Sequence, residues 1–149
     1  GVYLRSFPPE EYADRLVAYL REQGYDWPEE RIRAAAPLVQ EKITRLGEFP
    51  AFAGFLFGDV EPDPSLLDSR ILREAERALE RVEPWRADAI EQALKALCDE
   101  LGEKPRSVYP SIRVAVTGSR VSPGLYESLE LLGRETALSR IRAAASVAA

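Results

Sequence analysis

The segment RVAVTGSRVSPG, residues 113–124, has the residue types of a phosphate-binding turn. A short β-branched run precedes Gly118, and Gly124 follows just before an apolar helical pattern begins. A dinucleotide-binding turn needs the spacing G-x-G-x-x-G after a strand, and a P-loop needs G-x-x-x-x-G-K-[ST]. Here the two glycines stand six positions apart and no lysine follows the second, so neither motif fits. We therefore expect no nucleotide site at this turn.

Side chains for conventional catalysis are scarce along the chain. The sequence has no His, which removes the commonest general base and metal ligand, and Cys98 is its one cysteine. A catalytic triad, an internal disulfide and a thiolate metal cluster are therefore excluded. Paired carboxylates such as Glu10-Glu11 and Glu29-Glu30 stand at predicted helix starts, where the helix dipole favours them. We expect no catalytic residue, no metal site and no bound cofactor in this chain.

The bulk composition indicates a packed protein that is part of something larger. Of its 149 residues, 46% are hydrophobic and 30% are charged, which is typical of a folded domain. The sequence has no Met, whereas a complete reading frame starts with one, so we expect a piece of a longer protein. No apolar run reaches the length needed to cross a bilayer, and no signal peptide is visible. The expected location is the cytoplasm, where a lone thiol stays reduced.

The net charge of −5 is unevenly distributed. Residues 1–102 hold 13 Lys and Arg against 21 Asp and Glu, a net of −8, and residues 103–149 hold 7 against 4, a net of +3. A basic final third on an acidic chain is a modest indication of an anionic partner.

Helical periodicity accounts for most of the chain. Apolar residues recur every three or four positions between Pro and Gly punctuation, which predicts an all-α protein. The acidic, proline-bearing segment Asp59–Pro64 is the best linker candidate, and it divides the expected domains into residues 1–60 and 61–149. The expected helices begin near Pro8, Pro28, Leu67, Pro84, Pro110 and Pro123 and after Gly133, with a short buried helix or turn over residues 49–57. The helix from Pro28 is expected to run as far as Gly47.

Residues 112–117, IRVAVT, form the one strand-like hexamer. A parallel sheet needs several buried strands, and the rest of the chain has the helical pattern, so we predict a short helix started by Pro110. Ser122-Pro123 has the form of a helix N-cap followed by proline at the first helical position.

The C-terminal segment resembles the end of bacterial-type glutamyl-tRNA synthetases. That family's pattern has an Arg, small apolar residues, T-G, then S/T-P-G-L-F/Y-E, L-L-G-x-E and an Arg-rich last helix. The matching positions are Arg113, Thr117-Gly118, Ser122-Pro123-Gly124-Leu125-Tyr126-Glu127, Leu131-Leu132-Gly133 and Glu135. Residues 38–57 resemble, less closely, a family helix ending in T-L-x-E-F-P and an aromatic cluster.

The resemblance implies a fold and a role. It implies a helical cage of two small subdomains, residues 1–60 and 61–149, that grips the anticodon stem-loop of glutamate tRNA. The family's ATP- and Mg-dependent aminoacylation machinery lies in an N-terminal catalytic domain whose HIGH-like and KMSKS-like signatures are absent here. The resemblance therefore implies that this chain binds tRNA as a monomer, away from any membrane, and catalyses nothing alone, while the longer protein is a glutamate–tRNA ligase.

The resemblance also implies the residues that contact the anticodon. They are Lys42, Arg113, Ser122, Pro123, Gly124, Leu125 and Tyr126. Unstacked loop bases are read by stacking platforms and by hydrogen bonds to base edges, which Tyr126 and Arg113 would supply. Family members that reject glutamine tRNA have an Arg at the position of Lys42, with Arg45 nearby as the other candidate. A Lys cannot make the bidentate contact, which extends the expected partners to glutamine tRNA.

Two other functions remain open from the residues. A helical protein-interaction module without RNA binding would suit the acidic first 102 residues, because they repel a polyanion. A small nucleotide-binding enzyme using the VAVTGS turn would require a sheet.

Overall fold

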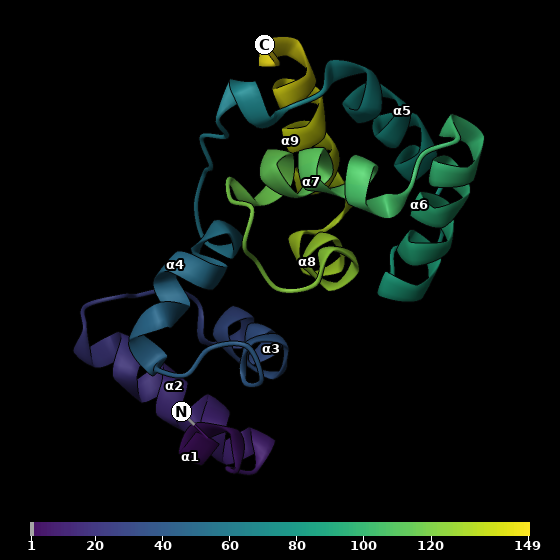
Figure 1. Ribbon diagram of the computed structural model, residues 1–149. Helices are drawn as coiled ribbons and strands as arrows, with labels where there is room; N and C mark the ends of the chain where they lie inside the picture. The colour runs from purple at the N-terminus through teal and green to yellow at the C-terminus, as the bar shows by residue number, and fades with distance from the viewer. Residues whose placement is uncertain (1) are drawn as a thin grey trace. The chain divides into compact units, whose positions relative to one another are not determined.

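The computed structural model describes residues 2–149, with side chains from residue 4 onward. No strand occurs among residues 2–149, and helices account for most of that range, which confirms the predicted all-α class. Two compact units make up the chain, one ending at Gly58 and the other running from Asp59 to Ala149 (Figure 1). In the described part of the chain, no helix combines the length and the apolar character of a membrane span.

The first unit is built on a pair of packed helices, α2 and α3. Proline opens α2 and two glutamates fill its first turn, which suits the positive end of the helix dipole. Its apolar stripe buries Leu16 and Leu20 completely, as the spacing predicts. The elements in order are α1 (Val2–Arg5), α2 (Pro9–Glu22), α3 (Glu29–Val39), the 3₁₀ turn η1 (Leu46–Glu48), α4 (Phe49–Ala53) and the 3₁₀ turn η2 (Gly54–Leu56).

The expected long helix from Pro28 to Gly47 is wrong, because α3 ends at Val39. The next residue, Gln40, is buried, and its Nε2 donates to the carbonyl oxygens of Leu4 at 3.2 Å and Phe7 at 2.9 Å. Ile43 is still 2% exposed, so its apolar side chain reaches the core from a turn. Apolar spacing alone could not show that a tertiary amide contact ends the helix.

Tyr12 of α2 lies in the core of the first unit with its side chain 0% exposed and no hydrogen-bond partner for its hydroxyl among the described residues. Burial, and then the nearby Glu48 carboxylate, raises the pKa of this phenol to about 12. Since an unpaired buried hydroxyl is unfavourable, Tyr12→Phe should raise the free energy of unfolding by about 1 kcal/mol at neutral pH. Urea unfolding of both proteins measures this difference.

The gain from Tyr12→Phe should grow in alkali. The folded pKa is raised above the unfolded value of 10.0, so the parent keeps its full stability below pH 10.0 and loses stability as pH rises from 10.0 toward about 12, whereas a Phe does not titrate. At about pH 11 the difference in free energy of unfolding between Tyr12→Phe and the parent should be roughly 1 kcal/mol larger than at neutral pH. If the stability difference between Tyr12→Phe and the parent is the same at both pH values, the fold does not hold Tyr12 in its neutral form.

The second unit packs four helices around α7. That helix contacts α5, α6, α8 and α9, and α5 also packs along α9 (Figure 1). The bounds are η3 (Pro64–Leu66, a 3₁₀ turn), α5 (Ser69–Glu80), α6 (Ala87–Leu101), α7 (Pro105–Thr117), α8 (Leu125–Leu132) and α9 (Arg134–Val147). Asp68 caps α5 by accepting from the backbone N–H of Ile71 at 3.1 Å.

The helix that carries IRVAVT begins at Pro105, not at the predicted Pro110. Pro105 occupies the first helical position, where a missing N–H has no cost, and Pro110 lies on the exposed side within α7. The β-branched residues Val108, Ile112, Val114 and Val116 are each at most 1% exposed. Their burial in the centre of the unit outweighs their weak preference for strands.

The prediction that a helix starts at Pro84 is also wrong, since α6 begins at Ala87. The N–H of Ala87 donates to the Oε1 of Glu130 on α8 at 2.8 Å. Trp85, just before it, donates its indole N–H to the carbonyl of Leu129 at 2.9 Å. Contacts from α8 therefore fix where α6 starts.

Candidate nucleic-acid interface

Arg113 and the loop that follows α7 come together in the second unit. The Nη1 of Arg113 donates to the Oγ of Ser122 at 2.5 Å and to the carbonyl oxygen of Pro123 at 2.9 Å. Among the described residues, all hydrogen bonds of this guanidinium pass through Nη1. Its Nε and Nη2 are not buried unpaired atoms, so one edge of the planar fork remains for a further acceptor.

We call Arg113 together with residues 122–127 the Arg113 corner. Several of its hydrogen bonds converge on the carbonyl oxygen of Pro123. Besides Arg113, it accepts from the hydroxyl of Ser122 at 2.8 Å and from the hydroxyl of Ser128 at 3.2 Å. Ser128 is 0% exposed, so its side chain anchors the corner to the interior of the unit. Converging donors of this kind hold the backbone in one conformation before any ligand arrives.

The predicted helix start at Ser122-Pro123 is wrong, because α8 begins at Leu125 with Gly124 at the N-cap position. The Ser122 hydroxyl bonds to Pro123 and Arg113 instead of capping the helix. The local sequence favours a Ser122 cap on α8. In the structure the Ser122 hydroxyl instead accepts from the guanidinium of Arg113 on α7.

Thr117 and Gly118 turn the chain out of α7. The Thr117 hydroxyl lies 2.8 Å from the carbonyl of Arg113 and 2.9 Å from the carbonyl of Ser119, and it accepts from the Ser119 N–H at 3.2 Å. Gly118 has φ +75°, a left-handed conformation that favours glycine. A Cβ at Gly118 would lie 3.3 Å from the Cβ of Val60, so the glycine also allows a close approach.

Leu125 and Tyr126, at the start of α8, have different environments. Leu125 is 4% exposed and Pro123 is also buried, so both support the corner from beneath. Tyr126 is half-buried, and its hydroxyl lies 2.9 Å from that of Tyr109 on α7. The two rings meet edge to face, with centroids 5.7 Å apart. The half-exposed and exposed groups at this corner are Arg113, Ser122, Gly124, Tyr126 and Glu127, whose carboxylate lies against Gly124.

The electrostatics of the corner favour an uncharged Tyr109 phenol near a guanidinium. Burial raises the pKa of Tyr109, and its hydrogen bond with Tyr126 raises it further. Burial lowers the pKa of Arg113, but a guanidinium remains charged at neutral pH. The exposed Lys95 of α6 pairs with Glu91 at 2.6 Å, and the hydrogen bond to that carboxylate raises the pKa of the ammonium. Polar atoms and an aromatic ring near a guanidinium suit an RNA base better than a hydrophobic ligand.

Lys42 belongs to the first unit. It is exposed in the turn after α3, and its backbone N–H donates to the carbonyl of Val39 at 2.8 Å. The hydroxyl of Thr44 donates to Glu48 at 2.8 Å and orders the next residues of the same segment. The ammonium of Lys42 is thus presented from an ordered turn.

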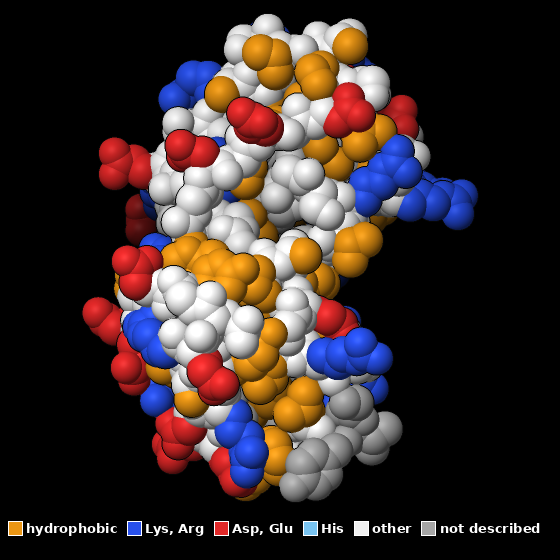
Figure 2. Space-filling model, turned by 90° about the vertical axis from the view of Figure 1, so that its left-hand side faces the viewer, with side chains coloured by type: hydrophobic (Ala, Val, Ile, Leu, Met, Phe, Trp, Pro, Cys, Tyr) orange, Lys and Arg blue, Asp and Glu red, His pale blue; other side chains and the backbone are white. Residues whose placement is uncertain are grey.

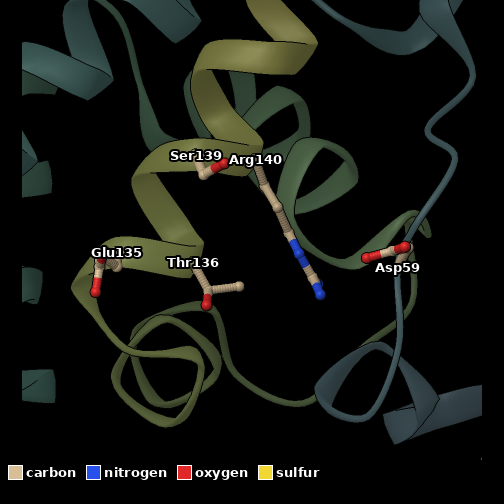
Figure 3. A pocket seen from close by; sticks show the side chains of 5 residues that line it. All are labelled: Asp59, Glu135, Thr136, Ser139 and Arg140. Carbon is tan, nitrogen blue, oxygen red and sulfur yellow. The ribbon is translucent and has the colours of Figure 1, made fainter.

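A separate solvent-open cavity of about 440 Å³ lies beside α9 (Figure 3). Arg140 extends along it, with its Nη1 donating to the carbonyl of Val116 at 2.8 Å. The carboxylates of Asp59 and Glu135 share the lining, so the cavity has no net positive charge to attract a phosphate. On the face shown in Figure 2, Lys and Arg side chains are interspersed with Asp and Glu instead of forming one basic patch. The Arg113 corner, where an aromatic ring and a guanidinium lie together, is therefore the stronger candidate interface.

Sequence reasoning missed Tyr109 and Ser128. Tyr109 stands one helical turn before Arg113, so the i, i+4 spacing could have placed it on the same face once the helix start was known. Nothing in the sequence pattern indicated that Ser128 would bond to Pro123. No group of His, Cys, Asp and Glu side chains suited to a metal ion occurs within the described residues.

Comparison with known proteins connects this geometry to a family. Residues 11–145 match the family described as the anticodon binding domain. The chain is 45% identical to the glutamate–tRNA ligase of Kocuria rhizophila, over 96% of this chain and 31% of that protein. It is 46% identical to that of Kineococcus radiotolerans, over 95% of this chain and 32% of that protein. It therefore spans about a third of the length of these relatives.

A solved structure has the same fold. The crystal structure of a glutamate tRNA ligase from Elizabethkingia meningosepticum, in complex with its amino acid, superposes with a TM-score of 0.82 over 99% of this chain and 31% of that one. The sequence identity in that match is 19%, so the likeness concerns the fold. The family match covers both units and the Arg113 corner, and the chain belongs to the anticodon binding domain family.

Proposed function

We propose that this chain recognises the anticodon stem-loop of glutamate tRNA as the C-terminal region of a glutamate–tRNA ligase. The observation that carries the proposal is the Arg113 fork, which is braced through Nη1 against Ser122 and Pro123. Bracing fixes the fork's orientation, and the remaining nitrogens can donate to the edge of one base. Family membership and the glutamate–tRNA ligase relatives support the choice of RNA over another anion.

Recognition would proceed in two physical steps. Lys and Arg side chains attract the phosphate backbone, a contribution that weakens as salt rises and carries no sequence information. The corner then reads unstacked anticodon bases, with Tyr126 as a stacking surface and Arg113 and the Ser122 hydroxyl as hydrogen-bonding groups. The Glu127 carboxylate lies against Gly124, so a base that reaches the backbone there would displace this side chain, while buried Pro123 and Leu125 hold the corner in place.

We assign the two units complementary tasks within the domains expected at residues 1–60 and 61–149. The first contributes Lys42 and the second contributes the Arg113 corner as proposed anticodon contacts. ATP and Mg would be used by a catalytic domain elsewhere in the longer protein, with this chain acting in the cytoplasm as part of a monomer. The chain's own residues bind and orient tRNA and carry out no bond-making step.

A titration tests this function directly. Fluorescently labelled RNA hairpins carrying the glutamate anticodon and a fully replaced anticodon are each titrated with the chain at several salt concentrations. We expect saturable binding to both, a negative slope of log affinity against log salt, and tighter binding of the glutamate anticodon. A helical protein-interaction module would bind neither hairpin, and equal affinity for the two would contradict anticodon readout.

Lys42 makes a separate prediction about discrimination between tRNAs. Because an ammonium cannot form the bidentate contact of a guanidinium, Lys42→Arg should raise the preference for glutamate over glutamine tRNA by roughly fivefold or more. The measurement is the dissociation constant for glutamine tRNA divided by that for glutamate tRNA, so that a higher ratio means a stronger preference for glutamate tRNA. Arg45→Lys is the matched control, and we expect it to leave the ratio unchanged. If Arg45→Lys lowers the ratio and Lys42→Arg does not raise it, the readout belongs to Arg45.

A further inference from the structure

One face of α7 holds the segment that follows it at three places. Tyr109, Arg113 and Thr117 stand at four-residue intervals, so their side chains lie along one face of the helix. Thr117 contacts Ser119, Arg113 contacts Ser122 and Pro123, and Tyr109 contacts Tyr126. Successive turns of the helix thus hold successive parts of residues 119–126 through polar bonds.

Tyr109 is the member of this face that touches the exposed ring. Its hydroxyl bond of 2.9 Å and its edge-to-face packing, with the two ring planes 83° apart, restrict both torsions of the Tyr126 side chain. The backbone of Tyr126 is held as well, because the adjacent Leu125 is 4% exposed. A half-exposed tyrosine without such a partner would sample several rotamers, and ordering it on binding would cost free energy.

We propose that Tyr109 is a positioning residue for anticodon readout, which sets the orientation of the Tyr126 ring before RNA arrives. The inference rests on the proposed function of the Arg113 corner. Tyr109 acts through Tyr126, and Arg113, one turn further along α7, stands in a fixed relation to both rings. The ring and the guanidinium fork are therefore set for neighbouring bases by the same helix.

The test removes single hydroxyl groups and keeps both rings. Tyr109→Phe, Tyr126→Phe and the double variant are titrated with the hairpin carrying the glutamate anticodon and with the hairpin whose anticodon is replaced. Each single change should weaken binding of the glutamate hairpin by about 2- to 10-fold, the range expected for one hydrogen bond. The double variant should be no weaker than the weaker single variant, because both changes break the same bond.

Binding of the hairpin with the replaced anticodon distinguishes a positioning role from a structural one. If Tyr109 only supported the fold, Tyr109→Phe would weaken binding of both hairpins. We expect binding of the replaced hairpin to stay unchanged in Tyr109→Phe, because electrostatic capture does not involve the ring. Tyr12→Phe is the matched control: it removes a hydroxyl from a fully buried ring, and both affinities should equal those of the parent.

Three results would overturn the inference. They are equal weakening of both hairpins by Tyr109→Phe, unchanged binding of the glutamate hairpin, and losses that add in the double variant. In each of these the parent would still prefer the glutamate hairpin, so the proposed function would stand. A parent chain that shows no preference between the hairpins would overturn the function and the inference together.

Discussion

Arg113→Ala should weaken binding of the glutamate anticodon hairpin by roughly 5- to 150-fold, corresponding to about 1–3 kcal/mol. The loss has two sources. Alanine removes the free edge of the fork that would reach a base, and it releases Ser122 and Pro123 from the bonds that fix the corner. Binding of the replaced hairpin should fall much less, because that RNA is held by charge alone.

Two matched variants separate these sources. Arg113→Lys keeps the positive charge without the planar fork, and it should lose most of the discrimination that Arg113→Ala loses. Arg142→Ala removes an exposed arginine that pairs with Glu76 on α5, and it should weaken both hairpins to a similar, small extent. If Arg113→Lys binds and discriminates like the parent, Arg113 contributes only charge and the base contact is wrong.

Gly118→Ala should lower the free energy of unfolding by about 2 kcal/mol. The residue adopts φ +75°, which an L-residue occupies at a cost of about 1–2 kcal/mol. Its new Cβ would also press on Val60 at 3.3 Å, tighter than an ordinary contact, so a packed neighbour has to move. Because Gly118 directs the chain from α7 into the corner, affinity for the glutamate hairpin should fall as well.

Gly102→Ala provides the control for backbone strain. Gly102 ends α6 with φ +67°, and a Cβ there would meet nothing within 4 Å. This variant should be destabilised by about 1 kcal/mol and should keep the parent's preference for the glutamate anticodon. Chemical unfolding of both variants measures the difference that the Val60 contact contributes. If Gly118→Ala and Gly102→Ala lose the same free energy of unfolding, the contact with Val60 does not destabilise Gly118→Ala.

The sequence determined the fold class, and it indicated which residues form the Arg113 corner. Apolar residues at helical spacing fixed α2 and the buried stripes of α5 and α9, because an amphipathic helix must bury one face whatever its neighbours are. The S-P-G-L-Y run and the preceding arginine indicated a corner, and Arg113, Ser122 and Pro123 are bonded to one another there. Whether that corner reads an anticodon stays a prediction until the titrations are made.

Tertiary structure decided where helices start and stop. α3 ends where Gln40 reaches the carbonyls of Leu4 and Phe7, and α6 starts where Glu130 accepts from Ala87. Local sequence encodes spacing and propensity, whereas these bonds join residues that lie 33 to 43 positions apart in the chain. The pairing of Tyr109 with Tyr126 was likewise decided only by the packing of α7 against α8, since a hydroxyl finds its partner after the backbones have met.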